Sequence, residues 1–467
     1  MRNVRELVLS ALRIIRNEGW RVFWRRARSY FAQRRRRGGL KIEPLRINPI
    51  DPQRRGVVIN KKVSIVIPTK NAGTDFELTL ERIKSQIGVK ETELIVVDSG
   101  STDDTVKLAE DHGALVYITR PTEFNHGLTR NYGAGKSTGY YILFMVQDAI
   151  PTTEHWLFDM VNVLENDKGI AAVTCRQIPR NDADLFARYL LWTYYQALEL
   201  SRDEVRITNS RFDDLSPTEK RRLCGLEDVC CLIRKDIFDK FKFSNIQYAE
   251  DLELGVRLQR NGYRLAFLYS VGVVHLHNRN ASYYMRRAYV DSKLLPQILG
   301  YEPAWQYREI HGINGLINSI ISLYAALNMS IPSLQPSDEN ACNVISRLKA
   351  LLQDSLKSPT ALKSYEKAGK YLDELFDELK KKLNIMGSPE SYASINESYF
   401  AALSDFSVYL GQNNTLKSTE PEFIDALYKI LATVAGYAIA NYYVLNSRGH
   451  DISEELSAVD RVLSAGV

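Results

Sequence analysis

Apolar runs alternate with amphipathic segments over residues 62–150. The runs are short and rich in Val, Ile, Leu and Tyr, whereas the segments between them repeat apolar residues at helical spacing. This alternation is typical of a parallel α/β sheet. We therefore expect strands at 63–69, 93–99, 114–120 and 140–149, joined by helices near 75–87, 103–112 and 126–138.

The strand pattern disappears after about Tyr284, and the rest of the chain has the apolar spacing of helices, as in 361–383. Two uncharged stretches, 311–337 and 430–447, are long enough to raise the question of a membrane span. In the first, Asn314, Asn318 and Ser322 recur every fourth residue, and the second is barely long enough. We interpret the first as an amphipathic helix and the second as a buried core helix.

The first 40 residues combine an apolar and aromatic helical face with twelve arginines. Such a helix can lie in a membrane interface, because apolar burial and attraction to anionic headgroups add. Packing of this face on the protein itself, covered by arginine side chains, is the alternative. Residues 41–60 contain three prolines and resemble a linker. We therefore expect basic helices and a linker at 1–60, an α/β domain at 61–300 and a helical domain at 301–467.

Charge is distributed unevenly along the 467 residues, which carry a net charge of +5. Residues 1–40 contribute +10, from twelve Arg against Glu6 and Glu18, so the remainder sums to −5. A uniformly basic nucleic-acid binder is therefore excluded. Five cysteines without a C-x-x-C pair favour a reducing compartment over a disulfide frame, and arginines interrupt any secretion signal.

Polar residues follow every expected strand, where ligands of α/β sheets bind. The segments are 68–71, 98–103, 120–126 and 147–150. Asp98 ends a strand and can accept a hydrogen bond from a nucleobase, whereas Asp103 and Asp104 fit an ordinary helix start. Arg130 and Asn131 lie one turn into a helix, where Arg130 either binds phosphate or forms a surface salt bridge. The nearby GAGKST has Arg130 where a phosphate loop needs Gly, so that interpretation fails.

Carboxylates and histidines recur near the ends of later elements. Asp148 closes a strand and can ligate a divalent cation. Glu250 and Asp251 begin a helix, either as solvated first-turn residues or with Asp251 deprotonating a hydroxyl. His275 and His277 lie on one face after a strand, which suits a metal or phosphate contact as well as a structural role.

Taken in order, six motifs resemble the family 2 glycosyltransferases of the GT-A fold over about residues 62–290. They are VSIVIPTKN (63–71), VVDSGSTDDT (96–105), FNHGLTRNYGA (124–134), MVQDAIP (145–151), YAEDLELGVRLQRNGY (248–263) and VVHLHN (273–278). The third and fourth are most similar to the bacterial rhamnosyltransferase-like group that builds O-antigen and other surface polysaccharides. The resemblance implies a Rossmann-like, mostly parallel GT-A domain. The all-α C-terminal domain that we expect to follow it rests on the apolar spacing and lies outside the resemblance.

The resemblance also implies roles for individual residues. Asp251 matches the catalytic Asp of the family's E-D motif, with Glu250 as the second candidate, and would deprotonate an acceptor hydroxyl in an inverting reaction. Asp148 matches the first acidic place of the DxD-type motif, and Ile150 replaces the second. Mg²⁺ or Mn²⁺ would then be held by Asp148 with His275 or His277. The expected nucleotide-sugar contacts are Pro68, Thr69, Asn71, Asp98, Ser99, Arg130, Asn131, Gln147 and Asp148.

The implied partners are a dTDP- or UDP-linked sugar and a glycan acceptor on a lipid carrier, with no nucleic acid. We expect a peripheral protein on the inner face of a bacterial cytoplasmic membrane, bound through residues 1–40. The helical domain would serve a homo-oligomer or a partner enzyme. The aromatic segment 184–200 is either core or a sugar platform.

Two other functions compete with the transferase. One is a catalytically silent glycan-binding or scaffold subunit, motivated by Ile150 and the large helical domain. The other is a nucleotidyltransferase, which would need a basic, glycine-rich loop after the first strand, where IPTKNAG offers only Lys70 and Gly73.

Overall fold

The computed structural model describes residues 40–44, 56–208, 211–303, 307, 310, 312–334, 341–357, 371–385, 393–413, 420–447 and 452–465. The expected membrane-binding segment therefore lies outside the described residues, apart from Leu40. Most of the expected linker and residues 361–370 of the expected helix 361–383 also lie outside them.

Half of the sheet consists of parallel strands in the order β4-β3-β2-β5. The strands are β2 (Val63–Thr69), β3 (Thr92–Asp98), β4 (Leu115–Ile118) and β5 (Tyr141–Met145), joined through α3 (Asp75–Lys84), α4 (Thr105–Asp111) and α5 (His126–Lys136). These elements confirm the α/β prediction to within a few residues at their ends. β2 and β5 are almost wholly buried, which explains their uninterrupted apolar runs.

The other half of the sheet is mixed, and the whole sheet has the order β1-β8-β10-β7-β9-β5-β2-β3-β4. Its strands are β6 (Ile150–Pro151), β7 (Ile170–Ile178), β8 (Glu204–Thr208), β9 (Cys230–Arg234) and β10 (Arg264–Val274). β9 runs antiparallel to both β5 and β7, whereas β7 and β10 are parallel. β1 (Leu40–Pro44) pairs antiparallel with β8, so the start of the expected linker is an edge strand. One edge of β8 was open to backbone hydrogen bonds from another strand. The sequence LKIEP alternates apolar and polar residues, as strands do.

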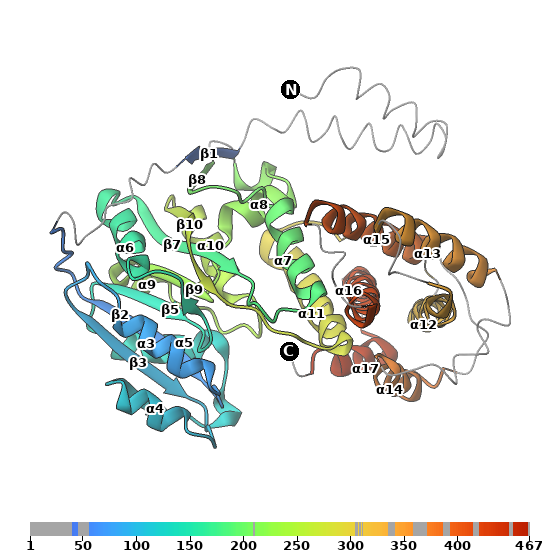
Figure 1. Ribbon diagram of the computed structural model, residues 1–467, viewed down its shortest axis with the longest axis horizontal. Coiled ribbons are helices and arrows are strands. Elements are labelled where there is room, and N and C mark those ends of the chain that lie inside the picture. Colours follow the sequence, from blue (N-terminus) through green and yellow to red (C-terminus); the bar gives the residue numbers. More distant parts are fainter. Residues whose placement is uncertain are drawn as a thin grey trace.

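Helices cover both faces of the sheet, giving three layers (Figure 1). α3, α4 and α6 (Trp156–Asn166) pack on one face, and α5, α9 (Lys235–Phe241) and α10 (Glu250–Arg260) on the other. Short 3-10 turns occur at Pro121–Glu123, Phe212–Asp214 and Ile331–Ser333.

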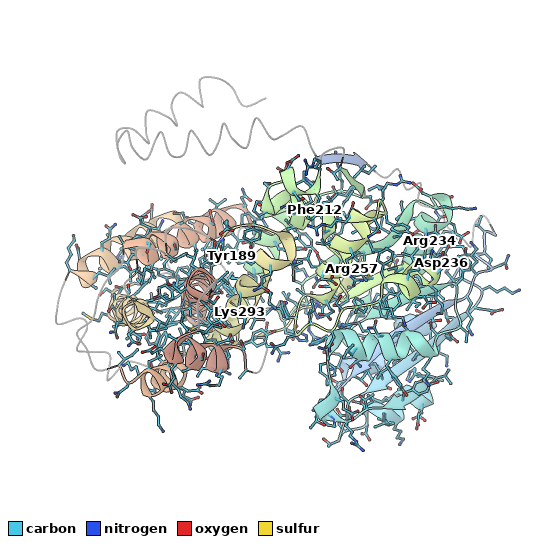
Figure 2. All side chains as sticks on the ribbon, turned by 180° about the vertical axis from the view of Figure 1, so that it is seen from behind. Tyr189, Phe212, Arg234, Asp236, Arg257 and Lys293 are labelled. Atoms are coloured by element: carbon cyan, nitrogen blue, oxygen red, sulfur yellow. The ribbon has the colours of Figure 1, made fainter. Side chains whose placement is uncertain are left out.

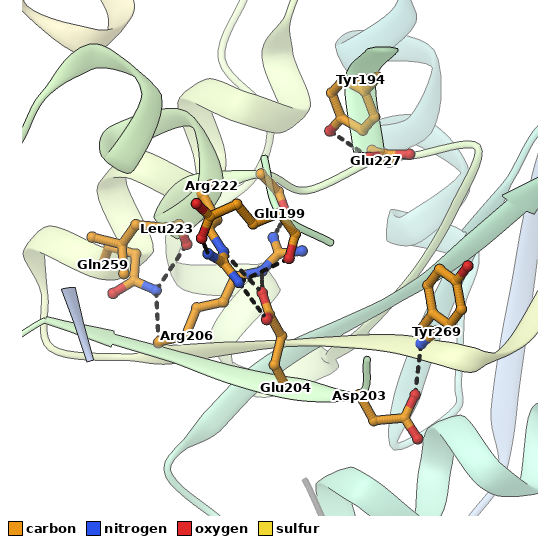
Figure 3. A network of polar contacts seen from close by, with 11 residues as sticks. Tyr194, Glu199, Asp203, Glu204, Arg206, Arg222, Leu223, Glu227, Gln259 and Tyr269 are labelled. Carbon is orange, nitrogen blue, oxygen red and sulfur yellow. Dashed lines mark hydrogen bonds and ion pairs between the residues drawn. The ribbon is translucent and has the colours of Figure 1, made fainter. Parts of the chain in front are cut away.

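A buried ionic network fastens α8 (Pro217–Cys224) to the sheet near its β1 edge (Figure 3). Glu204 of β8 is fully buried and forms ion pairs with Arg206 at 3.5 Å and with Arg222 of α8 at 2.8 Å. Arg206 donates to the carbonyl of Gly225 at 2.6 Å. The network therefore fixes the loop at 225–229, which becomes important at the site.

The C-terminal part consists of helices around α12 and α16, which lie at its centre (Figure 1). The helices are α11 (Ala281–Leu299), α12 (Gly312–Ser330), α13 (Ala341–Leu356), α14 (Asp373–Leu383), α15 (Ala393–Asn413), α16 (Glu420–Ser447) and α17 (Glu454–Leu463). α12 and α16 are long and apolar enough to cross a membrane, yet 72% of the most apolar window of each is buried inside the protein. The expectation of a buried core helix at 430–447 is thus confirmed, although α16 begins ten residues earlier, at Glu420.

The helical core does not stop at residue 300. It includes side chains from α7 (Leu185–Ala197) and α11, such as Phe186, Tyr189 and Tyr289. Tyr189 lies where the sheet domain and the helical part meet, and its ring packs against Phe406 and Tyr409 (Figure 2). Tyr189 is therefore a core residue, as the first of the two interpretations of the aromatic segment 184–200 expects.

Candidate functional site

A cleft of about 330 Å³ opens at the carboxyl edge of the parallel strands. Among its lining residues are eight of the expected ones: Pro68, Thr69, Ser99, Arg130, Gln147, Asp148, His275 and His277. Lys70, Pro121, Phe124, His126 and Val146 complete the lining. The polar residues expected at the strand ends therefore meet in one cleft, although some are more than 200 positions apart in the sequence.

Three expected contacts do not line the cleft but support its walls. The buried carboxylate of Asp98 accepts from Thr69 Oγ1 at 2.9 Å and from the backbone N–H groups of Gly100 and Ser101. Asn71 has a φ of 44° and accepts from Thr102 N, which ties the β2 and β3 loops together. Asn131 exchanges two hydrogen bonds with the backbone of Phe243, at 2.8 and 3.0 Å. The expected base contact from Asp98 stays a prediction.

Asp148, His275 and His277 converge at the cleft, with one ligand atom from each lying within 4.8 Å of the others. His277 Nε2 lies 2.8 Å and His275 Nε2 3.7 Å from the Asp148 carboxylate. β6 explains this convergence, because Ile150 pairs with Val274 and so places the Asp148 loop beside His275. Ile150, which stands where the family often has a second Asp, is therefore the strand residue that assembles the cluster.

The charge states in this cluster suit a cation. Burial lowers the pKa of His275 to about 4, so its ring is neutral and offers a lone pair. Burial alone would raise the pKa of Asp148, but the hydrogen bond from His277 and the nearby imidazoles hold it below its ordinary value. One carboxylate and two imidazoles are a donor set that divalent metals accept.

Arg130 lines the cleft and neutralises an acidic group behind it, which consists of Asp228 and Glu250. Its guanidinium is almost fully buried and pairs with Asp228 at 2.8 Å and Glu250 at 3.0 Å. The ion pairs of Arg130 are buried, so the surface salt bridge is wrong, whereas the expected contact with phosphate stays a prediction. The charge of Arg130 serves the cleft and the acidic group at once.

Asp251 lies next to this acidic group at the start of α10. Its carboxylate accepts from the backbone N–H groups of Leu252 at 2.7 Å and Asp228 at 3.3 Å. Burial and the charge of Asp228 raise the pKa of Asp251 to about 7, which suits a general base at neutral pH. Burial and the charges of Asp228 and Asp251 raise the pKa of Glu250 to about 9, despite Arg130, so Glu250 is the weaker candidate.

Residues of the site that sequence reasoning missed are Gln177, Glu227 and Asp228. Gln177 lies near the end of β7, and the other two lie two and three residues before the start of β9. β9 is antiparallel, and Cys230 pairs with Met145 at the carboxyl end of β5. The beginning of β9 therefore lies at the functional edge, where only strand ends were searched. The acidic pair directly before the apolar run VCCLI (229–233) was the available signal.

Residues 64–241 match the description Glycosyl transferase family 2. The chain carries a family 2 glycosyltransferase domain. Over 220 residues it is 29% identical to the O-antigen chain rhamnosyltransferase WbaN of Salmonella anatum, covering 46% of this chain and 66% of that protein. It is 29% identical to the O-antigen chain rhamnosyltransferase RfbN of Salmonella typhimurium, covering 46% and 67%. The match to WbaN thus spans just under two thirds of that relative's length.

Among solved structures, the glycosyltransferase domain and the helical part together are similar to the mannosyltransferase PcManGT of Pyrobaculum calidifontis, which was solved with GDP-Man and Mn²⁺. The identity is 17%, the TM-score 0.43, and the coverage 90% of this chain and 94% of that one. At this TM-score the likeness carries no weight of its own. The Rossmann-like GT-A architecture rests on the strand order and on the family 2 match.

Proposed function

We propose that the protein is an inverting glycosyltransferase that builds a surface polysaccharide. It would move a sugar, with a rhamnose-like deoxysugar favoured, from a dTDP- or UDP-linked donor to a hydroxyl of a growing, lipid-linked glycan. The observation that carries this proposal is a pair of features joined by Arg130. A cation-binding cluster lines the cleft, and a carboxylate poised near neutral pH lies behind its Arg130 wall.

Asp148, His275 and His277 would hold the divalent cation. Their imidazoles favour Mn²⁺ over Mg²⁺, since Mg²⁺ prefers oxygen ligands. When bound, the ion neutralises negative charge on the diphosphate leaving group. Arg130 adds a fixed positive charge on the wall of the same cleft.

Asp251 would act as the base. It accepts the proton of the acceptor hydroxyl as that oxygen forms a bond to the anomeric carbon and the bond to the diphosphate breaks. Attack from the face opposite the leaving group inverts the anomeric configuration. A base with a pKa near 7 combines a large unprotonated fraction with a useful affinity for the proton.

The names of the relatives support the donor and pathway. WbaN and RfbN are named O-antigen chain rhamnosyltransferases, and their similarity extends over 220 and 221 residues. The arginine-rich sequence of residues 1–40 supports attachment to the inner face of a bacterial cytoplasmic membrane. Homo-oligomer formation or docking of a partner enzyme through the helical part stays a prediction.

The test combines a donor panel with Asp251→Asn. Turnover of dTDP-, UDP-, GDP- and CDP-sugars with Mn²⁺ is measured on a lipid-linked glycan acceptor, and nucleotide binding by calorimetry. We expect turnover with a dTDP- or UDP-sugar, and a loss of about 10²–10⁴-fold in kcat for Asp251→Asn with nucleotide affinity unchanged.

Asp213→Asn is the matched control, because Asp213 is exposed and pairs only loosely with Arg260 at 3.5 Å. It should retain wild-type turnover. Full activity of Asp251→Asn would show that Asp251 is not the base. A wild-type protein that binds glycan but turns over no donor would instead support the scaffold function.

A further inference from the structure

We propose that Gln177 and Glu227 are positioning residues that hold His275 as a metal ligand. This inference rests on the proposed cation site and adds residues that lie behind it. Neither side chain lines the cleft, so both act through His275.

A continuous chain of hydrogen bonds runs from helix α7 to the cleft. Tyr194 Oη donates to Glu227 Oε1 at 2.6 Å (Figure 3). Gln177 Nε2 donates to Glu227 Oε2 at 2.6 Å, and Gln177 Oε1 lies 2.9 Å from His275 Nδ1. The last member, His275, faces Asp148 with its other nitrogen.

The chemistry of these groups gives the chain one direction. Glu227 Oε2 accepts the hydrogen bond, so the amide N–H₂ of Gln177 points toward Glu227. The amide oxygen of Gln177 is then left facing His275, whose Nδ1 must carry the proton. The lone pair of the neutral ring is therefore on Nε2, the atom that faces the cluster.

Three elements keep the chain in place. Gln177 is near the end of β7, and its backbone N–H donates to Tyr195 Oη at 2.7 Å. His275 follows β10, and its backbone N–H donates to Ile178 O at 3.0 Å. Glu227 lies on the loop that the Arg206 network fixes through Gly225. Movement of the imidazole would therefore break hydrogen bonds that several fixed elements supply.

Loss of the chain should weaken metal binding without removing a ligand. If Glu227 cannot accept, the Gln177 amide is free to turn its N–H₂ toward Nδ1. His275 would then carry its proton on Nε2, toward Asp148, and lose its lone pair there. Removal of such supporting partners elsewhere costs about 10–100-fold in metal affinity.

The experiment measures Mn²⁺ binding by electron paramagnetic resonance on the full chain without donor. Gln177→Leu and Glu227→Leu break the chain, whereas Glu227→Gln keeps an acceptor for Gln177. Asp213→Asn is the control, because it neutralises an exposed carboxylate that pairs with Arg260 outside the chain. Histidine ¹⁵N chemical shifts report the tautomer of His275 in the same proteins.

We expect the dissociation constant for Mn²⁺ to rise about 10–100-fold in both leucine variants and to stay near the wild-type value in Glu227→Gln and Asp213→Asn. The ¹⁵N shifts should show that the His275 proton has left Nδ1 only in the leucine variants. If Gln177→Leu does not fold, the comparison of Glu227→Leu with Glu227→Gln still decides. Folded leucine variants with wild-type affinity and tautomer would overturn the proposal.

Wild-type protein and Asp148→Ala separate this outcome from a failure of the proposed function. Binding by the wild type that Asp148→Ala abolishes establishes the cation site. If the wild type binds no Mn²⁺, the cation site itself is wrong and the positioning role falls with it. If the wild type binds and the leucine variants bind equally, only the positioning role is wrong.

Discussion

At the scale of single residues, Asp228 contacts both Arg130 and the proposed base Asp251. Its carboxylate pairs with Arg130, and its backbone N–H reaches the carboxylate of Asp251. Arg221 of α8 interacts electrostatically with Asp251, and Glu250 of α10 and His126 of α5 interact with Asp228. Asp228 is thus the neighbour whose negative charge most directly disfavours ionisation of Asp251.

A pH profile tests this coupling. Because Asp251 must be unprotonated to act, kcat/KM of the wild type should rise with pH through about 7 and then level off. Asp228→Asn removes a like charge, so the pKa of Asp251 falls and the acid limb should move to lower pH by about 1 unit or more. An acid limb that stays in place in a folded, active Asp228→Asn would contradict this origin of the raised pKa.

Sequence reasoning found the residues whose position follows from strand ends, and missed those that follow from strand direction. Asp148, His275 and His277 each come after an apolar run, so their convergence was predictable. Glu227 and Asp228 come before a run, and they reach the same edge only because β9 is antiparallel. Strand direction depends on pairing partners that are distant in the sequence, and local patterns do not contain it.

At the scale of elements, α11 and α16 cross closely at Gly436. A Cβ built there would lie 2.1 Å from the carbonyl oxygen of Met285 and 3.0 Å from Ala288 Cβ. The backbones must therefore separate to admit even a methyl group. Gly411 in α15 is the opposite case, since nothing lies within 4 Å of its added Cβ.

These two glycines give a matched pair of variants. Gly436→Ala should lower the free energy of unfolding by about 1–3 kcal/mol through overpacking. Gly411→Ala should raise it by about 0.5–1 kcal/mol, because alanine loses less backbone freedom in a helix. Urea unfolding followed by circular dichroism measures both. Equal effects of the two substitutions would contradict a tight crossing at Gly436.

As with single residues, the elements that follow from the local sequence pattern could be predicted, and those that depend on distant pairing partners could not. The helices and strands at 63–145 form consecutive α/β units, and their ends were predicted to within a few residues. β1 and β6 have five and two residues and exist through pairing with β8 and β10. Such short strands have little local signal, because their partners supply the hydrogen bonds that define them.

At the scale of the whole molecule, the sheet domain and the helical part share a core and a buried ion pair. Lys429 of α16 is almost fully buried and binds Asp184 at 2.8 Å, just before α7. Asp184 also caps α7 by accepting from Ala187 N at 2.8 Å. A helix of the C-terminal part therefore fixes the start of α7, the helix from which Tyr194 reaches Glu227.

This shared core means that the boundary expected at residue 300 does not separate two independent units. A fragment of residues 61–300 would expose buried side chains of α7 and α11 that belong to the helical core: Leu185, Phe186, Tyr189, Tyr284, Met285 and Tyr289. At about 1.5–3 kcal/mol for each, the lost burial is on the order of 10 kcal/mol. That equals the stability of a typical domain, about 5–15 kcal/mol.

We therefore expect the fragment 61–300 to aggregate or to bind an apolar dye, and to lack the cooperative thermal transition of the full chain. Dye fluorescence, light scattering and calorimetry on both proteins measure this. A full chain carrying Lys429→Met serves as the intermediate case, since it keeps the apolar core but leaves Asp184 without its buried cation and should be destabilised by about 3–5 kcal/mol. A monomeric fragment that melts cooperatively without binding dye would show that the transferase half folds alone, and that the helical part serves only docking.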